Sequence, residues 1–334
     1  MSESNNWPST RDAQGPMKKS ISLLAKQKIQ SNDAEGLPES AKRFADGSRW
    51  KIEIPSVEGP AAFKVVLEEA KKHKLPVARI SQGSGIMMLT DVEIKEMVAI
   101  GKSENIEVCL FVGPRASWDI GKQVLSSAGG VANPTLRGAD QLRYAVEDVL
   151  HGADLGLRSI LVGGMGLLKV LGEAKRNGDL PSDFVLKTSV AMPCNNPATA
   201  ELMVSMGAST LNLATDLSLQ QIAAIRAQVD VPVDVYVEGP DDFGGPVRHY
   251  EVPDLVRVAA PIYLKFTVRN SPGLYPSGTH IQGVVESNVE APQRLVRLEG
   301  KGKQTDNLLS FIVFCGSVER SNEGKKKNLI WSLT

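Results

Sequence analysis

Three polar side chains that could take part in catalysis share one face of a stretch that otherwise has the pattern of a buried strand. Residues 233–245 are VDVYVEGPDDFGG, in which Asp234, Tyr236 and Glu238 alternate with three valines. Side chains alternate across a strand, so the two carboxylates and the phenol point the same way. An unpaired buried charge costs several kcal/mol, so these groups require counter-ions, a ligand or water. Glu238, at the carboxyl end, is the candidate general acid or base.

Two lysines in other strand-like stretches offer a second kind of chemistry. Lys187 lies in FVLKTSV and Lys265 in PIYLKFTVR. An interior amine whose pKa is lowered by burial and by a neighbouring cation can form a Schiff base with a carbonyl substrate. Lys187, Lys265, Glu238 and Asp234 are therefore the candidate catalytic residues of a lyase or aldolase-type reaction. Asp234 and Lys265 are equally well explained as an ion pair that holds the interior together.

A divalent metal is the alternative to the lysine chemistry. Glu53, Asp234 and Glu238 could converge on a cation that activates water or an enolate, and their oxygen ligands would suit Mg²⁺ or Mn²⁺. That arrangement would favour a hydrolase. The four histidines are far apart and form neither HExxH nor HxH, so a histidine-rich metal site is not expected.

The elements that must position these residues alternate regularly from residue 50 onward. Short β-rich runs are separated by helical patterns, which implies parallel strands joined by crossover helices. The strand-like runs are 51–55, 76–81, 106–113, 158–163, 184–190, 209–215, 232–239 and 261–269. Eight such units over about 230 residues predict a (β/α)8 TIM barrel in the α/β class. A doubly wound open sheet is the runner-up, but PSVEGP after the first run lacks its GxGxxG turn.

The alternation within each strand separates an aliphatic face from a polar one. The aliphatic set is expected to face the helices: Ile52, Val108, Leu110, Leu211, Leu213, Val233, Val235, Ile262, Leu264 and Phe266. The other set is expected to face the barrel axis: Glu53, Arg79, Ser81, Glu107, Cys109, Lys187, Ser189, Asn212, Asp234, Tyr236, Glu238, Tyr263, Lys265, Thr267 and Arg269. A barrel filled only for stability would be aliphatic inside, so this polar interior indicates pairing, ligand binding or both.

Substrate contacts are expected where the strands end, because TIM-barrel active sites lie at the C-terminal face. The candidate substrate-binding residues are Arg115, Arg269, Ser81, Gln82, Ser189, Asn212, Tyr236 and Trp118. The longest connection, residues 113–138, contains basic and aromatic residues and reads as a lid over an anionic substrate or as a contact between subunits of a homo-oligomer. After the second strand, Gly83 and Gly85 leave backbone amides able to approach an anion, or simply form a tight turn.

Composition limits the classes of partner and compartment. The 334 residues contain 38 Lys plus Arg and 38 Asp plus Glu, so no overall field favours nucleic acid. No run approaches the roughly 18 apolar residues of a membrane span. Three cysteines without a CxxC pair indicate a reducing, cytoplasmic location. The predicted organisation is a polar N-terminal arm (1–48), the barrel (49–300) and an irregular C-terminal tail (301–334), with a small molecule as the expected substrate.

Several segments resemble bacterial TIM-barrel proteins related to peptidase family U32. They are ISQGSGIMMLTDVEI, CLFVGPRASWDIG, LRGADQLRYAVEDV and DVYVEGPDDFGGPVRHYEVPDLVRVAAPIYLKFTVRN. The resemblance implies the barrel fold and a hydrolase label. Family members carry cysteines after a Glu-Gly pair near the seventh strand, and some relatives bind an iron–sulfur cluster. No cysteine comes directly after Glu238–Gly239–Pro240, so no iron–sulfur cluster is expected. A non-catalytic ligand-binding or scaffold barrel with an internally salt-bridged interior remains the alternative to an enzyme.

Overall fold

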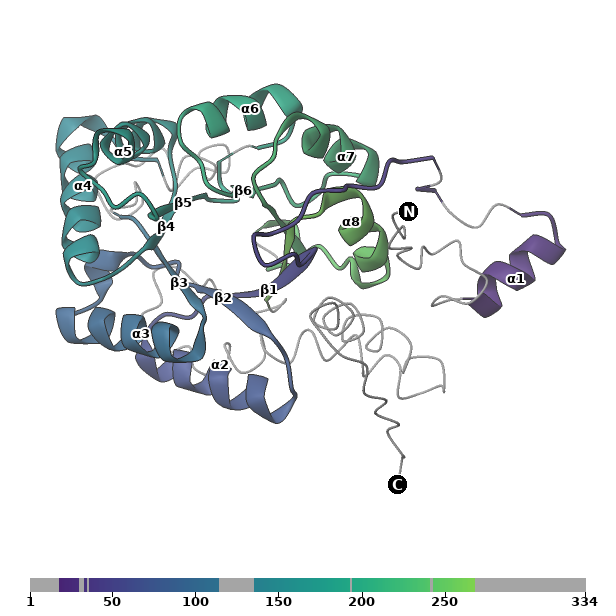
Figure 1. Cartoon of the computed structure of the whole chain (residues 1–334), viewed down its shortest axis with the longest axis horizontal. Coiled ribbons are helices and arrows are strands. Elements are labelled where there is room, and N and C mark those ends of the chain that lie inside the picture. Colours follow the sequence, from purple (N-terminus) through teal and green to yellow (C-terminus); the bar gives the residue numbers. More distant parts are fainter. Residues whose placement is uncertain are drawn as a thin grey trace, which may run out of the picture.

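Eight parallel strands form a closed barrel in the computed structural model, which describes residues 18–29, 33–34, 36–113, 135–192, 194–240 and 243–267 (Figure 1). The strands are β1 (Trp50–Pro55), β2 (Val77–Ser81), β3 (Glu107–Phe111), β4 (Ser159–Val162), β5 (Val185–Thr188), β6 (Leu211–Asn212), β7 (Val233–Glu238) and β8 (Ile262–Phe266). They are hydrogen-bonded in the order β5-β4-β3-β2-β1-β8-β7-β6. Ser209 N donates to Leu186 O at 2.8 Å, which joins β5 to β6 and closes the ring. The predicted TIM barrel is confirmed.

Helices lie between successive strands and surround the barrel (Figure 1). They are α2 (Pro60–Lys72), α3 (Asp91–Glu104), α4 (Gly138–Asp154), α5 (Met165–Asn177), α6 (Pro197–Ser205), α7 (Leu219–Gln228) and α8 (Val252–Ala259), with short 3-10 turns η1 (Ile86–Met88) and η6 (His249–Glu251). Local signals set their ends. Thr90 and Ser218 each form a capping box at the start of α3 and α7. Gly156, at φ 94°, ends the turn after α4 in a left-handed conformation that favours glycine.

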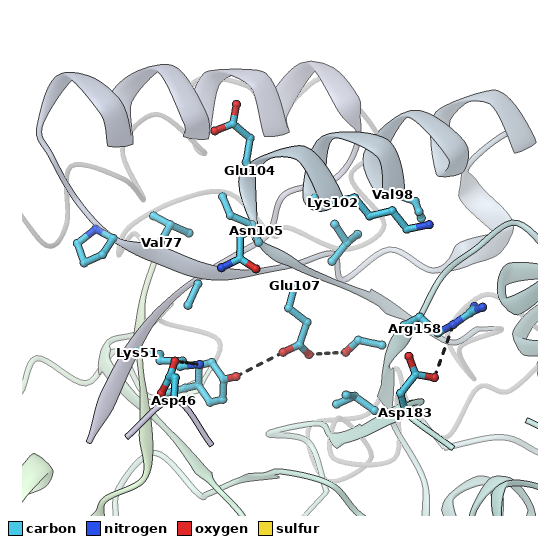
Figure 2. Close-up of a pocket in the computed structure, with 18 of the residues that line it drawn as sticks. Asp46, Lys51, Val77, Val98, Lys102, Glu104, Asn105, Glu107, Arg158 and Asp183 are labelled. Carbon is cyan, nitrogen blue, oxygen red and sulfur yellow. Dashed lines mark hydrogen bonds and ion pairs between the residues drawn. The ribbon is translucent and has the colours of Figure 1, made fainter. Parts of the chain in front are cut away.

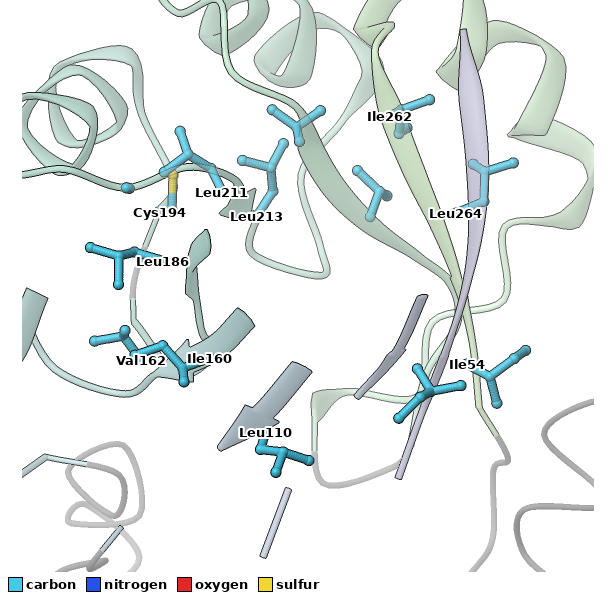
Figure 3. Close-up of a cluster of buried hydrophobic side chains, with 14 of the residues drawn as sticks. Ile54, Leu110, Ile160, Val162, Leu186, Cys194, Leu211, Leu213, Ile262 and Leu264 are labelled. Atoms are coloured by element: carbon cyan, nitrogen blue, oxygen red, sulfur yellow. The ribbon is translucent and has the colours of Figure 1, made fainter. Parts of the chain in front are cut away.

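The aliphatic faces of the strands pack against the helices and form the main hydrophobic core. All ten residues predicted to face outward are buried in this cluster. Figure 3 shows part of it, with Leu110, Leu186, Leu211 and Leu264 projecting from β3, β5, β6 and β8. The consequence is that the core lies in the layer between strands and helices, and the barrel axis is left to the other strand face.

The chain before β1 divides into two parts. Helix α1 (Lys18–Lys26) lies apart from the barrel in Figure 1. Residues 36–49 instead run along the barrel and are tied to it. Ser40 N donates to Arg257 O at 2.8 Å, and Arg257 Nη1 donates to Leu37 O at 2.7 Å. The polar N-terminal segment therefore includes a strap bound to α8. The predicted tail, residues 301–334, lies outside the described residues.

No helix among the described residues is both long and apolar enough to span a membrane.

Candidate functional site

A fully buried carboxylate, Glu53 on β1, organises the interior of the barrel. Its Oε2 contacts Lys187 Nζ of β5 and Arg79 Nη1 of β2, the latter at 3.2 Å. Its Oε1 accepts a hydrogen bond from Ser81 Oγ at 2.8 Å. Strands on opposite sides of the barrel therefore meet at one side chain, as the inward-facing pattern predicted.

Asp234 on β7 completes the same group of charges. Its Oδ2 lies 2.9 Å from Lys187 Nζ and its Oδ1 lies 3.3 Å from Arg79 Nη1. Thr210 Oγ1 donates to Oδ1 at 3.0 Å. We refer to Glu53, Arg79, Lys187 and Asp234 as the floor network. All four side chains are at most 2% exposed, so the network is closed to solvent.

Arg79 connects the floor network to the N-terminal end of the barrel. Its Nε lies 2.9 Å from Glu107 Oε1 of β3, and its guanidinium stacks over the Tyr263 ring at 3.6 Å. With Lys265, the interior then contains three cations against the three carboxylates of Glu53, Asp234 and Glu107. The charges balance, which is the condition for keeping them buried.

The protonation of Glu53 follows from this balance. Burial alone would raise the pKa of the carboxyl group, but the charges of Lys187, Lys265 and Arg79 outweigh burial and hold its pKa well below 4.5. Glu53 is therefore ionised at neutral pH. A permanently charged carboxylate suits a structural counter-ion better than a proton donor.

Lys265 on β8 has a different environment from Lys187. Its Nζ lies 3.6 Å from Glu53 Oε1, beyond hydrogen-bonding distance. It sits 4.1 Å from the centre of the Tyr236 ring. The Asn212 side-chain oxygen, in the amide orientation that satisfies its neighbours, accepts from Lys265 Nζ at 2.8 Å and from Val190 N at 3.1 Å. The ammonium is therefore held mainly by neutral groups.

A small cavity lies above Lys265 at the C-terminal mouth of the barrel. Its volume is about 40 Å³, and the residues that line it are Pro55, Ser81, Gln82, Gly83, Phe111, Leu161, Ser189, Val190, Ala191, Asn212, Tyr236, Phe243 and Lys265. Among these described residues, Lys265 alone carries a charge. Burial and the nearby Glu53 charge raise the pKa of the Tyr236 phenol, so it stays neutral. The structure thus brings the candidate residues Ser81, Gln82, Ser189, Asn212 and Tyr236 together with Lys265 around this cavity.

The turn after β2 binds an anion of the chain itself. Gly83 N and Ser84 N donate to the Glu58 carboxylate at 2.9 and 3.0 Å. The Gln82 side chain accepts from Gly85 N at 3.0 Å and donates to Gly85 O at 2.9 Å. The amides that could have met a substrate anion are therefore engaged. Glu58, which sequence reasoning overlooked, could have been noticed as a carboxylate directly before a helix.

The structure does not place Glu238 at the cavity. A register shift in β7 pairs Glu238 with Phe266, whose side chain belongs to the hydrophobic core. The Glu238 carboxylate contacts His249 Nε2 of η6 at 3.2 Å, and both side chains are 4% exposed. Strict alternation assigned Glu238 to the axis-facing set, but the register shift between Tyr236 and Glu238 interrupts that alternation. His249 was missed because it follows the strand by eleven residues.

The three carboxylates of the metal alternative are not gathered around one point. Glu53 and Asp234 both bind Lys187, which lies where a cation shared by them would lie. Glu238 contacts His249 instead. Within the described ranges, no group of three His, Cys, Asp or Glu side chains is arranged to hold a metal ion. The donor set therefore does not fit the Mg²⁺ or Mn²⁺ site that the sequence analysis predicted. The expected anion-binding residues Arg115, Trp118 and Arg269 lie outside the described residues.

A larger hollow, of about 1140 Å³, lies at the N-terminal end of the barrel. Figure 2 shows Glu107 pointing toward it. Ser159 Oγ donates to Glu107 at 2.6 Å, Tyr263 OH donates at 3.4 Å, and Arg158 lies 3.7 Å from Asp183. The carboxylates here are thus engaged within the protein. Because TIM-barrel chemistry takes place at the opposite face, size alone does not make this hollow the active site.

Comparison with family models finds one match, peptidase family U32, over residues 131–240. This stretch includes α4 to β7. The chain is a TIM-barrel protein, and part of it, residues 131–240, is similar to peptidase family U32. Comparison with curated proteins found no match. Of the residues discussed, Lys187, Asn212, Asp234 and Glu238 lie within the U32-related stretch, whereas Glu53, Arg79 and Lys265 lie outside it.

Several solved structures have a similar architecture, and three of them are described as different kinds of protein. The U32 peptidase Mk0906 has 14% identity and a TM-score of 0.39, with 73% of this chain and 99% of that chain covered. The putative copper homeostasis protein CutC from Streptococcus agalactiae has 13% identity and a TM-score of 0.43, with 64% and 97% covered. A putative deoxyribose-phosphate aldolase from Coccidioides immitis has 10% identity and a TM-score of 0.40, with 76% and 95% covered.

Proposed function

We propose that this U32-related barrel is a lyase of aldolase type, which binds a carbonyl substrate as a Schiff base on Lys265. The observation that carries the proposal is the contrast between its two interior lysines. Lys187 Nζ contacts two carboxylates, and its side chain is fully buried. Lys265 is also buried, with 2% of its side chain exposed, but it lines the cavity and has its nearest carboxylate at 3.6 Å. Of the two, Lys265 is the amine that a substrate could meet.

The chemistry requires Lys265 in its neutral form. The amine lone pair forms the C–N bond while the carbonyl π pair moves to oxygen. That oxygen leaves as water with the two amine hydrogens, and one further proton gives the iminium ion. The iminium then accepts the electron pair of the breaking carbon–carbon bond and becomes an enamine, while the hydroxyl on the departing carbon gives its proton to water and becomes a carbonyl group. Ser189, whose Oγ accepts from Ala191 N at 3.2 Å, keeps its own hydrogen available to the carbonyl oxygen.

In this scheme the floor network orients the reactive amine. Glu53 is anchored by Lys187, Arg79 and Ser81, and its carboxylate provides the charge nearest to the Lys265 ammonium. Asn212 and the Tyr236 ring fix the ammonium from the other sides. Lys187, Asp234 and Glu53 are thus positioning residues.

Trapping with borohydride tests the proposal. The full chain is treated with borohydride and each of several carbonyl compounds, and adducts are located by peptide mass spectrometry. We expect an adduct at Lys265 in excess of that at Lys64, whose side chain is 63% exposed. Lys265→Arg is the control that keeps the charge and should remove the specific adduct. Labelling of Lys265 no greater than that of Lys64 with every carbonyl compound would contradict the proposal.

A non-catalytic binding barrel is the second candidate, and the closed floor network favours it. Four charged side chains satisfied by one another are what a scaffold interior requires. In that case Lys265 would serve only to contact a ligand. The same trapping experiment distinguishes the two, because a scaffold would bind a small molecule without forming a reducible adduct.

A further inference from the structure

We propose that helix α1 (Lys18–Lys26) is a docking surface for an anionic lipid membrane and holds the barrel at that surface. The helix lies apart from the barrel (Figure 1). The proposal concerns the segment before the barrel and is independent of the Schiff-base function. Three features of this segment carry it: its charge, its apolar side chains, and the place where it joins the barrel.

The charge of the segment has one sign. Residues 18–29, KKSISLLAKQKI, contain four lysines and no Asp or Glu, whereas the whole chain has 38 residues of each sign. Lys19, Lys26 and Lys28 are exposed. Each lysine close to an anionic bilayer raises the affinity for it about fivefold. The segment is therefore complementary in charge to a surface of anionic headgroups.

Apolar side chains occupy the other side of the same helix. With 3.6 residues per turn, Ile21, Leu23 and Leu24 share one broad side of α1, and Lys19 and Lys26 lie on the opposite side. Leu23 is 58% exposed, and the other two apolar side chains are half-buried. A basic polar side opposite an apolar side is the arrangement of helices that lie in the plane of a membrane surface.

The short length of the helix favours lipid over the groove of an acidic protein. An amphipathic helix binds a groove through anchors at i, i+3 or i+4, and i+7. In α1, Ile21 and Leu24 fit this spacing for one turn, but the next position is Lys28. A lipid surface requires only a shallow apolar layer below the basic groups. It also stabilises a helix of nine residues, which is marginal by itself in water.

The segment joins the barrel on the side of the C-terminal mouth. Asp33 O accepts from Gln220 Nε2 at 3.3 Å, and Gln220 lies in the first turn of α7, directly after the loop that leaves β6. Ala34 O accepts from Arg257 Nη2 at 3.2 Å, and the strap of residues 36–49 continues to β1. Docking of α1 therefore keeps this side of the barrel close to the lipid surface.

Co-sedimentation with lipid vesicles tests the proposal. The full chain is mixed with vesicles of phosphatidylcholine alone or with about one third phosphatidylserine. We expect binding to the anionic vesicles at least about tenfold tighter than to the neutral ones, and weaker binding as salt is added. The double variant Lys19→Glu, Lys26→Glu should bind the anionic vesicles more than about tenfold more weakly.

A charge-matched variant on another helix is the control for these two substitutions. Lys64→Glu with Lys72→Glu on α2 makes the same change in net charge, and the two side chains are 63% and 62% exposed. This variant should bind the anionic vesicles like the unmodified chain. Equal weakening by the two double variants would overturn the proposal, because net charge and not α1 would then set the affinity.

A second pair of variants measures the apolar contribution. Leu23→Ser should lower the affinity for the anionic vesicles about fivefold, since a leucine loses its contact with the bilayer. Leu202→Ser on α6 is the control, because Leu202 has a similar exposure of 52%. Its affinity should equal that of the unmodified chain. Equal affinities of the Leu23→Ser variant and the unmodified chain would overturn the insertion of this side into the membrane.

Two further outcomes would overturn the proposal. One is equal binding of the unmodified chain to both kinds of vesicle. The other is no binding to the phosphatidylserine vesicles. Retention of the chain on immobilised polyglutamate in that second case, lost in the Lys19→Glu, Lys26→Glu variant, would assign α1 to an acidic polypeptide instead.

Discussion

The floor and the mouth of the barrel contain the same residue types in different roles. At the floor, Lys187 contacts Glu53 and Asp234, and every charge meets an opposite charge. At the mouth, Lys265 is held by an amide oxygen and an aromatic face, next to a cavity. A lysine on the inner face of a strand is thus either a structural counter-ion or an amine that lines a cavity. Its height along the barrel axis and its partners decide which.

The largest expected effect is a difference in the free energy of unfolding between variants of the two lysines. Lys187→Met leaves Glu53 and Asp234 buried with one cation fewer, so the free energy of unfolding should fall by about 3–5 kcal/mol. Lys265→Met leaves Glu53 with its other partners and should cost about 1 kcal/mol. Urea unfolding of both variants measures the difference. The reverse order would show that the charge at the mouth, and not the floor, holds the interior together.

The second prediction concerns the acid sensitivity of the floor. The pKa of Glu53 is lower in the folded chain than its ordinary value of 4.5. Its carboxylate therefore contributes stability that is complete above about pH 4.5 and is lost as the pH falls toward the folded-state pKa. Glu53→Gln should be less stable at pH 7 and should lose less stability than the unmodified chain between pH 4.5 and pH 3. Unfolding free energies measured across this range provide the check, and equal losses in both proteins would contradict it.

The third prediction has the smallest expected effect and concerns the access of a thiol reagent to the barrel interior below the mouth. Cys109 lies on the inner face of β3, paired with Ser159 of β4, whereas Cys194 packs in the outer core (Figure 3). Burial raises the pKa of both thiols to about 12. In a Cys315→Ser variant, a thiol reagent at pH 8 should find no reactive cysteine in the native chain and two after denaturation. Rapid native labelling of Cys109 would show that the mouth opens further than the cavity indicates.

The periodic parts of the structure were predictable because they depend on neighbours in sequence. The alternation of strands and helices identified eight βα units, and the period of two along each strand separated Ile52 from Glu53 and Leu264 from Lys265. The capping residues Thr90 and Ser218 were also visible locally. These features need no knowledge of which strands meet across the barrel.

The parts that sequence reasoning missed depend on distant neighbours or on one inserted residue. The register shift in β7 removed Glu238 from the inner set, which a strict alternation cannot foresee. Glu58 fills the turn around Gly83 from another loop. The metal alternative failed the geometric test because Lys187 lies between two of its three carboxylates.

By itself, the sequence determined the barrel, the aliphatic outer face and the polar inner face, because the period of a strand is a property of the chain alone. Only the tertiary structure decided that Lys187 is paired and that Lys265 lies at the cavity. The reason is that the environment of a buried charge is set by the strands opposite it, and those come from parts of the chain far away in sequence.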